Sequence, residues 1–217
     1  MNRLWGPYAQ RVMAGDRVWT WDGLTLQVPA GVFHPGLFFS SKFVARALGE
    51  LDLAGRLVAD VGCGSGLLAL TAARGGAHVL ALDINPAAVA TTQQNAARNG
   101  LLVEAAESDL LDAAAGRSVD LIVVNPPYFA ADPTDAASRA FFAGADFGYF
   151  DRFFAQVEPR VRSGTRVLMV LSGTCDLAAI GDRASRHRLE LRLWRRHRSA
   201  GLVENLLFDV VAAGLTA

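Results

Sequence analysis

The sequence predicts an α/β protein with a mainly parallel seven-stranded sheet, an antiparallel C-terminal strand pair and a small N-terminal hairpin. From Leu57 onward, short apolar runs alternate with helical patterns, which is typical of a parallel sheet covered on both faces. The last part of the chain instead alternates polar and apolar residues, as in strands with one exposed face. A glycine-rich loop lies between the first apolar run and the first helical pattern.

The composition indicates a single globular domain spanning 1–217, with 1–36 supplying the hairpin and a pocket-lining segment. A hydrophobic share of 52% and a charged share of 19% exclude a disordered chain. The formal net charge of zero gives no global attraction to nucleic acid or membrane. Two cysteines, no metal-binding cluster, no signal peptide and no membrane-length apolar run lead us to expect a cytoplasmic protein without a metal or membrane partner.

The elements follow in order along the chain. WTWDGLTLQV at 19–28 predicts a hairpin that turns at Asp22 and Gly23 and covers the pocket. The predicted parallel strands are Leu57–Val61, His78–Asp83, 102–107, 120–125 and Arg166–Ser172. The predicted helices between them are 67–73, 86–99 and 151–162.

The C-terminal part predicts the antiparallel pair that closes the sheet. Leu189, Leu191 and Leu193 alternate with polar residues, and LVENLLFDVV follows a turn at SAG. Five parallel strands followed by such a pair are the layout of Rossmann-like class I methyltransferases.

The DVGCGSG loop follows the first strand and opens a helix. Gly62 permits a sharp turn, whereas Gly64 and Gly66 let the backbone approach a ligand closely. Cys63 fits the loop as a small side chain. This arrangement alone does not separate a methyltransferase from a nicotinamide-binding protein, so the acidic residues decide between them.

Three aspartates favour S-adenosylmethionine. Asp60 precedes the loop, where it can bind the methionine ammonium group and would repel a pyrophosphate. Asp83 ends the second strand, where its carboxylate can accept both ribose hydroxyls. After the third strand, Ser108 precedes Asp109, which either accepts a hydrogen bond from the adenine amino group or caps a helix.

The NPPY sequence, at the end of the fourth strand, predicts nitrogen methylation. The Asn125 side-chain oxygen and the Pro126 carbonyl can accept both N–H groups of a planar amide or amine. Pro126 and Pro127 stiffen the loop, and Tyr128 can stack on the planar acceptor. Catalysis by positioning needs no general base before the methyl group moves.

These motifs resemble the HemK family of protein-glutamine N5-methyltransferases. DVGCGSG, DINPAA, SDL and NPPY occur in order, and VFHPG at 32–36, FFAGADFG at 141–148 and the closing SAGLVENLLFDV are similar to family segments. The resemblance implies S-adenosylmethionine as cofactor, S-adenosylhomocysteine as product and no metal. The cofactor-binding residues expected from the motifs and the resemblance are Phe33, Pro35, Asp60, Gly62, Cys63, Gly64, Gly66, Asp83, Ile84, Ser108, Asp109, Leu110 and Asn125.

The chain is most similar to the short branch of that family, which lacks a helical N-terminal domain. Members of this branch often bind a small zinc-binding activator subunit, so the resemblance implies such a subunit as a candidate partner. It departs from the family after the proline, where LFFSS at 37–41 replaces acidic and threonine residues. An arginine-rich stretch from Arg183 to Arg198 is either a solvated strand face or an RNA contact.

Four functional hypotheses follow. The resemblance favours methylation of a protein glutamine, as in a release factor. The altered LFFSS segment and the absent helical domain motivate a small-molecule amide or amine, and the arginine stretch motivates an adenine amino group in RNA or DNA. A non-catalytic cofactor-binding subunit is the fourth, and the intact NPPY argues against it.

Overall fold

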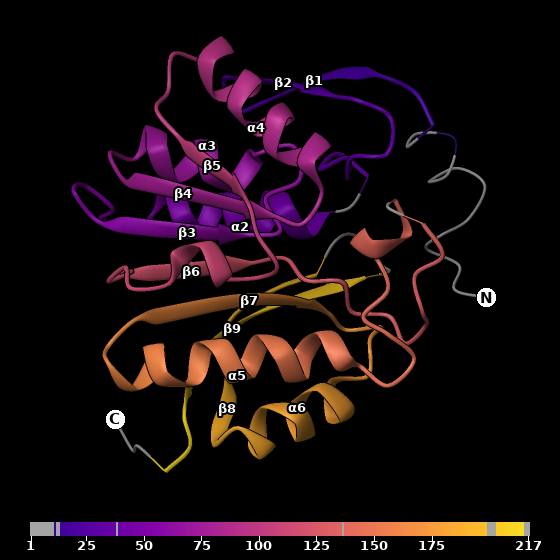
Figure 1. Ribbon diagram of the computed structural model, residues 1–217, viewed down its shortest axis with the longest axis vertical. Helices are drawn as coiled ribbons and strands as arrows, with labels where there is room; N and C mark the ends of the chain where they lie inside the picture. The colour runs from indigo at the N-terminus through magenta and orange to yellow at the C-terminus, as the bar shows by residue number, and fades with distance from the viewer. Residues whose placement is uncertain (1–10, 12–13, 38, 136, 199–202, 215–217) are drawn as a thin grey trace.

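The computed structural model describes residues 11, 14–37, 39–135, 137–198 and 203–214. Its main sheet has seven strands in the order β5-β4-β3-β6-β7-β9-β8 (Figure 1). The strands are β3 (Leu57–Val61), β4 (His78–Asp83), β5 (Glu104–Glu107), β6 (Leu121–Val124), β7 (Arg166–Ser172), β8 (Leu189–Arg198) and β9 (Glu204–Ala212). β3 to β7 pair in parallel, whereas β9 runs antiparallel to both β7 and β8. The predicted fold class is therefore confirmed.

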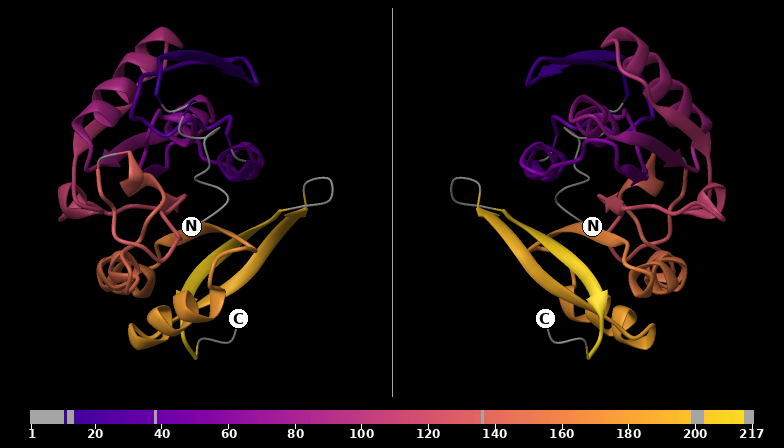
Figure 2. Two further views of the ribbon diagram at one scale, coloured as in Figure 1. Left: turned by 90° about the vertical axis from the view of Figure 1, so that its right-hand side faces the viewer. Right: turned by 90° about the vertical axis from the view of Figure 1, so that its left-hand side faces the viewer.

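Two hydrophobic cores lie on opposite faces of this sheet, since neighbouring residues of each strand point to opposite sides. Val58 belongs to one core and Ala59 to the other. Helices α2 (Phe39–Gly49), α3 (Leu67–Arg74) and α4 (Pro86–Arg98) contribute to the first core. Helices α5 (Gly148–Arg162) and α6 (Leu177–Arg186) contribute to the second, and they lie beside each other near β8 (Figures 1 and 2).

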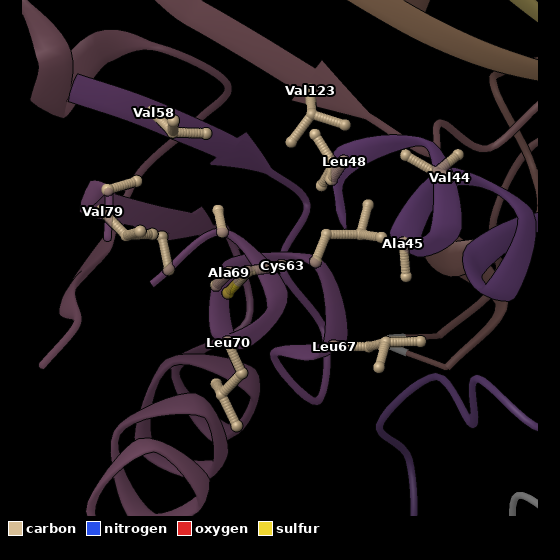
Figure 3. Close-up of a cluster of buried hydrophobic side chains, with 14 of the residues drawn as sticks. Val44, Ala45, Leu48, Val58, Cys63, Leu67, Ala69, Leu70, Val79 and Val123 are labelled. Carbon is tan, nitrogen blue, oxygen red and sulfur yellow. The ribbon is translucent and has the colours of Figure 1, made fainter. Parts of the chain in front are cut away.

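The first core places α2 and α3 against the middle of the sheet (Figure 3). Leu48 of α2 and Leu70 of α3 are fully buried together with Val58 and Val123 of the strands. Burial of a large aliphatic side chain contributes roughly 1.5–3 kcal/mol. This packing fixes the start of α2 beside the loop after β6, which matters for the site.

The N-terminal hairpin forms as predicted, between β1 (Arg17–Trp21) and β2 (Leu24–Val28). Asp22 and Gly23 have φ angles of 50° and 77°, as a two-residue hairpin turn requires. The Asn95 amide of α4 donates to the Gln27 carbonyl at 2.9 Å and accepts from its N–H at 2.8 Å. The hairpin covers α4, and no residue of β1 or β2 lines the cavity described below, so the expected pocket cover is not found.

Two helices were absent from the sequence prediction, α2 and α6, as were the short helices η2 (Asp112–Ala114) and η3 (Ser138–Ala140). Helix α4 begins at Pro86 as predicted, and α5 begins at Gly148, earlier than expected. The SAG turn lies outside the described residues. Within the part of the chain that the structure describes, no helix is long and apolar enough to cross a membrane.

Candidate cofactor and acceptor site

A cavity of about 1010 Å³ opens beyond the carboxyl ends of β3, β4 and β6. The predicted site residues that line it are Phe33, Pro35, Asp60, Gly62, Cys63, Gly64, Asp83, Ile84, Ser108, Asp109, Leu110, Asn125, Pro126, Pro127 and Tyr128. The glycine loop and the NPPY loop therefore face one continuous space. Its size suits a cofactor together with part of an acceptor.

The glycine loop bends because three glycines have positive φ angles, 75° at Gly62, 55° at Gly64 and 90° at Gly66. The N–H groups of Gly62 and Cys63 donate to the Leu82 carbonyl at 2.8 and 3.0 Å, which ties the loop to β4. Gly66 is not part of the cavity lining. A Cβ there would lie 3.0 Å from the Thr92 side chain, so this glycine permits close packing of the loop against α4.

Asp60 is a buried acid, only 1% exposed, at the bottom of the cavity. Its Oδ2 accepts a hydrogen bond from the Ala69 N–H at 2.9 Å, whereas Oδ1 is buried without a hydrogen-bond partner among the described residues. Burial raises the pKa of this carboxyl from 3.8 to about 7, and the neighbouring Asp83 raises it further. An unpartnered carboxylate oxygen that lines a cavity is suited to a cationic ligand.

Asp83 is held at the end of β4 by backbone N–H groups. Its Oδ2 accepts from Gly64 at 2.9 Å and its Oδ1 accepts from Asn85 at 2.9 Å. Burial raises the pKa of this carboxyl, and these two hydrogen bonds oppose the rise. Each oxygen keeps a second lone pair for hydroxyl donors from the cavity.

Asp109 forms an ion pair with Arg152 of α5, at 2.5 Å between Oδ2 and Nη1. Both residues line the cavity. The side chain that caps the following turn is Ser108, whose Oγ accepts from the Ala113 N–H at 3.0 Å. The capping role considered for Asp109 thus belongs to its neighbour, and the Asp109 carboxylate faces the cavity with its arginine.

The NPPY loop begins directly after β6, and its side chains are held from α2. The Asn125 Nδ2 donates to Ser41 Oγ at 3.0 Å and to Ser40 Oγ at 3.3 Å. The Tyr128 hydroxyl hydrogen-bonds to the Ser40 side chain, and burial raises the pKa of this phenol well above its usual value. Tyr128 therefore stays neutral at physiological pH and does not act as a base.

An aromatic wall combines two rings predicted as site residues, Phe33 and Tyr128, with rings of the segment after the NPPY loop to which sequence reasoning assigned no role. Phe33 and Phe141 lie 5.7 Å apart between ring centroids, and Tyr128 contacts Phe129 edge-on at 4.8 Å. These four rings, together with Phe142, line the cavity. The exposed Arg139 of η3 lies on the same lining.

From the sequence, His34 beside Pro35 could either contact a ligand or be a structural loop residue, and the structure gives it a structural environment. It is 7% exposed, and its Nδ1 accepts from the Gly36 N–H at 3.0 Å. Its ring contacts Trp19 edge-on at 6.0 Å, and it does not line the cavity. Among the described residues, no group of three or more potential ligands could hold a metal ion.

Comparison with known proteins identifies relatives that modify ribosomal components. Residues 23–147 match the methyltransferase small domain family. The ribosomal RNA small subunit methyltransferase C of Chromohalobacter salexigens is 34% identical over 170 residues, which cover 75% of this chain and 47% of that protein. The ribosomal protein L11 methyltransferase of Deinococcus radiodurans is 44% identical over 86 residues, or 35% of this chain and 32% of that protein. The chain thus spans about half or less of these curated relatives.

Solved structures show the same fold. The T. thermophilus 16S rRNA guanosine-N2 methyltransferase, in complex with S-adenosylmethionine and guanosine, has a TM-score of 0.65 at 24% identity. The alignment covers 89% of this chain and 50% of the other. A ribosomal protein L11 methylase from Lactobacillus delbrueckii has a TM-score of 0.58 at 24% identity, over 84% of this chain and 81% of the other.

The family match covers more than half of the chain, including the glycine loop, Asp60, Asp83 and the NPPY loop. The curated relatives described above are named for ribosomal RNA and for ribosomal protein L11, and neither is named as a glutamine methyltransferase. The chain belongs to the methyltransferase small domain family and is a class I methyltransferase that uses S-adenosyl-L-methionine.

Proposed function

We propose that this chain transfers the methyl group of S-adenosylmethionine to an exocyclic amino nitrogen of a purine base in RNA. The observation that carries the proposal is that Asp60, Asp83, the NPPY loop and the aromatic wall all line the same cavity. A ligand held by the two acids would lie beside a planar acceptor held by Asn125.

The cofactor fits the ionisable groups of this cavity. The unpartnered Asp60 Oδ1 suits the methionine ammonium group, since no other described group neutralises it. Each carboxylate oxygen of Asp83 can accept one ribose hydroxyl. Asp109, which follows the next strand and lines the same cavity, can accept a hydrogen bond from the adenine amino group. The sulfonium of the bound cofactor supplies an electrophilic methyl group.

The acceptor side suits a planar ring with an N–H₂ group. Asn125 Oδ1 and the Pro126 carbonyl can accept its two N–H bonds, and Tyr128 and Phe141 offer faces on which a base can stack. Stacking on aromatic side chains contributes roughly 1–3 kcal/mol per base in other single-strand-binding proteins. Because the neutral Tyr128 is no base, the chemistry depends on orientation and on stabilisation of the charge that develops on nitrogen.

An RNA acceptor is supported by the relative with the longest match among those described, a ribosomal RNA methyltransferase. It is also supported by charge beside the cavity. Lys42 and Arg46 of α2 lie 5.5 and 5.3 Å from the Phe39 ring, and His197 stacks on the same ring at 4.2 Å. Lys42 directly follows Ser41, which lines the cavity. These residues, Lys42, Arg46 and His197, are called the α2 cationic face; they lie outside the cavity lining, and we infer that they contact phosphates that flank an acceptor base.

We infer that the arginine-rich stretch does not act as one RNA-binding face, because most of its arginines pair with acidic side chains of the same chain. Arg183 of α6 binds Asp151, and Arg188 lies 3.6 Å from Glu158, so its first part links α6 to α5. At the other end of the stretch, His197 of β8 stacks on Phe39 of α2. We therefore restrict the proposed RNA contact to the α2 cationic face.

A protein side chain is the second candidate acceptor, because other relatives are ribosomal protein L11 methyltransferases and the motifs resemble glutamine methyltransferases. A glutamine amide is planar and offers the same two N–H bonds to Asn125. It would leave the aromatic wall and the α2 cationic face without a use, so the nucleobase explains more of the site.

The test is methyl transfer from radiolabelled S-adenosylmethionine to ribosomal RNA, ribosomal protein L11, a release factor and a metabolite extract, offered in parallel. Label in RNA, located at a purine amino group by nuclease digestion and mass spectrometry, is the expected result. Label confined to a protein or to a small molecule would refute the RNA proposal.

A further inference from the structure

The Asn125 side-chain amide is held from behind by two buried serines. Its Nδ2 lies 3.0 Å from Ser41 Oγ and 3.3 Å from Ser40 Oγ, so both amide hydrogens have acceptors. Ser40 is 2% and Ser41 5% exposed. Both belong to the first turn of α2, and they are 85 and 84 residues away from Asn125 in the sequence, respectively.

A carboxamide is nearly symmetric in shape and opposite in hydrogen-bonding character at its two ends. Once Nδ2 donates to the serines, Oδ1 is the end left for the cavity. We propose that Ser40 and Ser41 are positioning residues that fix the rotation of the Asn125 amide, so that its oxygen and not its NH₂ group meets the acceptor nitrogen. This inference rests on the proposed role of Asn125 in the function above.

The rotation decides whether the acceptor can be bound productively. An acceptor N–H₂ donates to a carbonyl oxygen but repels another NH₂ group. In the transfer, the nitrogen lone pair forms the N–CH₃ bond while the S–CH₃ electron pair returns to sulfur. A proton then leaves the nitrogen for water. An oxygen at Asn125 stabilises the positive charge on nitrogen before that proton departs, whereas an NH₂ group would oppose it.

Ser40 also links the amide to the other polar side chain of the loop. Its hydroxyl hydrogen-bonds to the Tyr128 phenol as well as accepting from Asn125. One residue of α2 therefore sets the rotation of the amide and the position of the ring on which the acceptor would stack. Ser41 contacts the amide and lines the cavity itself.

The kinetic test compares Ser40→Ala, Ser41→Ala and the double variant with the wild type. We expect kcat to fall roughly 5- to 10-fold for each single change and more for the double variant, since each removes one neutral hydrogen bond. The cofactor dissociation constant should stay within about twofold. Ser41→Thr, which keeps the hydroxyl, should restore most of kcat. In an Asn125→Ala background, Ser41→Ala should cost nothing further, because the group that it positions is gone.

The matched control is Ser172→Ala. Ser172 is also 2% exposed, but its hydroxyl bonds to Thr174 and it does not line the cavity. A similar loss of kcat in this control would mean that general destabilisation, and not the amide contact, explains the serine variants.

A second readout does not need activity. The side-chain NH₂ signals of Asn125, assigned by their absence in Asn125→Ala, should exchange slowly with solvent in the wild type. They should shift and exchange faster in the double serine variant. Unchanged signals, or an unchanged kcat in the double variant, would overturn the proposal. If the wild type labels no acceptor, the proposed function fails, and the amide signals alone decide whether the serines hold Asn125.

Discussion

Among the acidic residues that line the cavity, Asp60 has an unusual ionisation. Its carboxyl is buried, one oxygen has no partner among the described residues, and its pKa lies near 7 instead of 3.8. In the folded protein the group therefore keeps a proton between about pH 4 and 7, where the unfolded chain has lost it. The stability that this proton provides is fully present near pH 4 and disappears as the pH rises through 7.

Asp60→Asn should therefore stabilise the ligand-free protein relative to wild type above pH 7, and by little near pH 4. The shift from 3.8 to about 7 corresponds to about 4 kcal/mol at most, at about 1.4 kcal/mol per tenfold change in acidity. Urea unfolding of both proteins from pH 4 to 8 measures the difference. The same variant should bind S-adenosylhomocysteine at least tenfold more weakly, since the ammonium group loses its counter-charge. A difference in stability that does not change with pH would contradict the assigned pKa.

The Asn125→Ala variant distinguishes cofactor binding from methyl transfer at the end of β6. We expect turnover to fall by about 10²- to 10³-fold, as when one oriented transition-state contact is lost. Cofactor affinity, measured by calorimetry, should change less than about threefold, because the carboxylates proposed to hold the cofactor are Asp60 and Asp83. Loss of cofactor binding with normal turnover of the bound fraction would assign Asn125 to the cofactor instead.

Sequence reasoning found residues whose role depends on neighbours along the chain and missed those that depend on distant ones. Asp60, Asp83 and Asn125 follow strands, so their place at the carboxyl edge could be predicted from the strand pattern. The pairing of Asp109 with Arg152 joins residues 43 apart in the sequence and has no local signal. Of the two roles left open for Asp109, the cap belongs to Ser108, because a one-residue shift along the chain changes which side chain reaches the turn.

Among the elements, α2 explains most of what the sequence did not predict. Its buried positions include Ser40, Ser41, Phe43, Val44 and Ala45, and the two buried serines interrupt the apolar pattern where the helix begins. Helix α6 was missed because it is short and only two of its residues, Ile180 and Ala184, are buried. Because α2 was not predicted, the sequence showed the LFFSS segment only as a departure from the resembled family. In the structure this segment supplies the two serines that contact Asn125.

The α2 cationic face is expected to contribute to RNA binding. Lys42→Gln with Arg46→Gln should weaken binding to a fluorescein-labelled single-stranded RNA of about 20 nucleotides, with kcat at saturating RNA little changed. The plot of log affinity against log salt concentration should become shallower by about 1 to 1.5, as expected for two lost phosphate contacts. Fluorescence anisotropy between 50 and about 300 mM salt measures the slope.

The control for this prediction is Arg56→Gln with Arg186→Gln. Both are exposed arginines. Arg56 directly precedes β3 and so lies at the amino ends of the parallel strands, away from the cavity, and Arg186 is the last residue of α6. They remove the same net charge. Equal loss of affinity in both pairs would show attraction to the whole protein and refute a defined α2 cationic face.

At the scale of the whole molecule, the sheet order could be predicted because each parallel strand is a continuous apolar run separated by a helix, which leaves few topologies. The N-terminal hairpin was predicted from its turn, but its docking was not. Asn95 of α4 and Asn99 at its C-terminal cap bind the hairpin backbone, and sequence alone gives asparagines in and after a helix as solvent-facing. The position of the cavity could be predicted from the sequence, but its shape could not, because most of the aromatic wall comes from the irregular segment between β6 and α5.

The cavity is lined by residues from α2, from the loops after β3, β4 and β6, and from α5, so a bound cofactor joins parts of the molecule that belong to both cores. S-adenosylhomocysteine at about 100 times its dissociation constant should add about 2.7 kcal/mol to the free energy of unfolding. For a chain of 217 residues this corresponds to a rise in Tm of about 5 to 10 °C. Differential scanning calorimetry measures it, and at the same ligand concentration Asp60→Asn should lose about half of the rise or more, while Ser172→Ala keeps it. Because both cores meet at the site, amide exchange should slow in β3 and also in β6 and the start of α5. Protection limited to the glycine loop would mean that the ligand contacts only one side of the cavity.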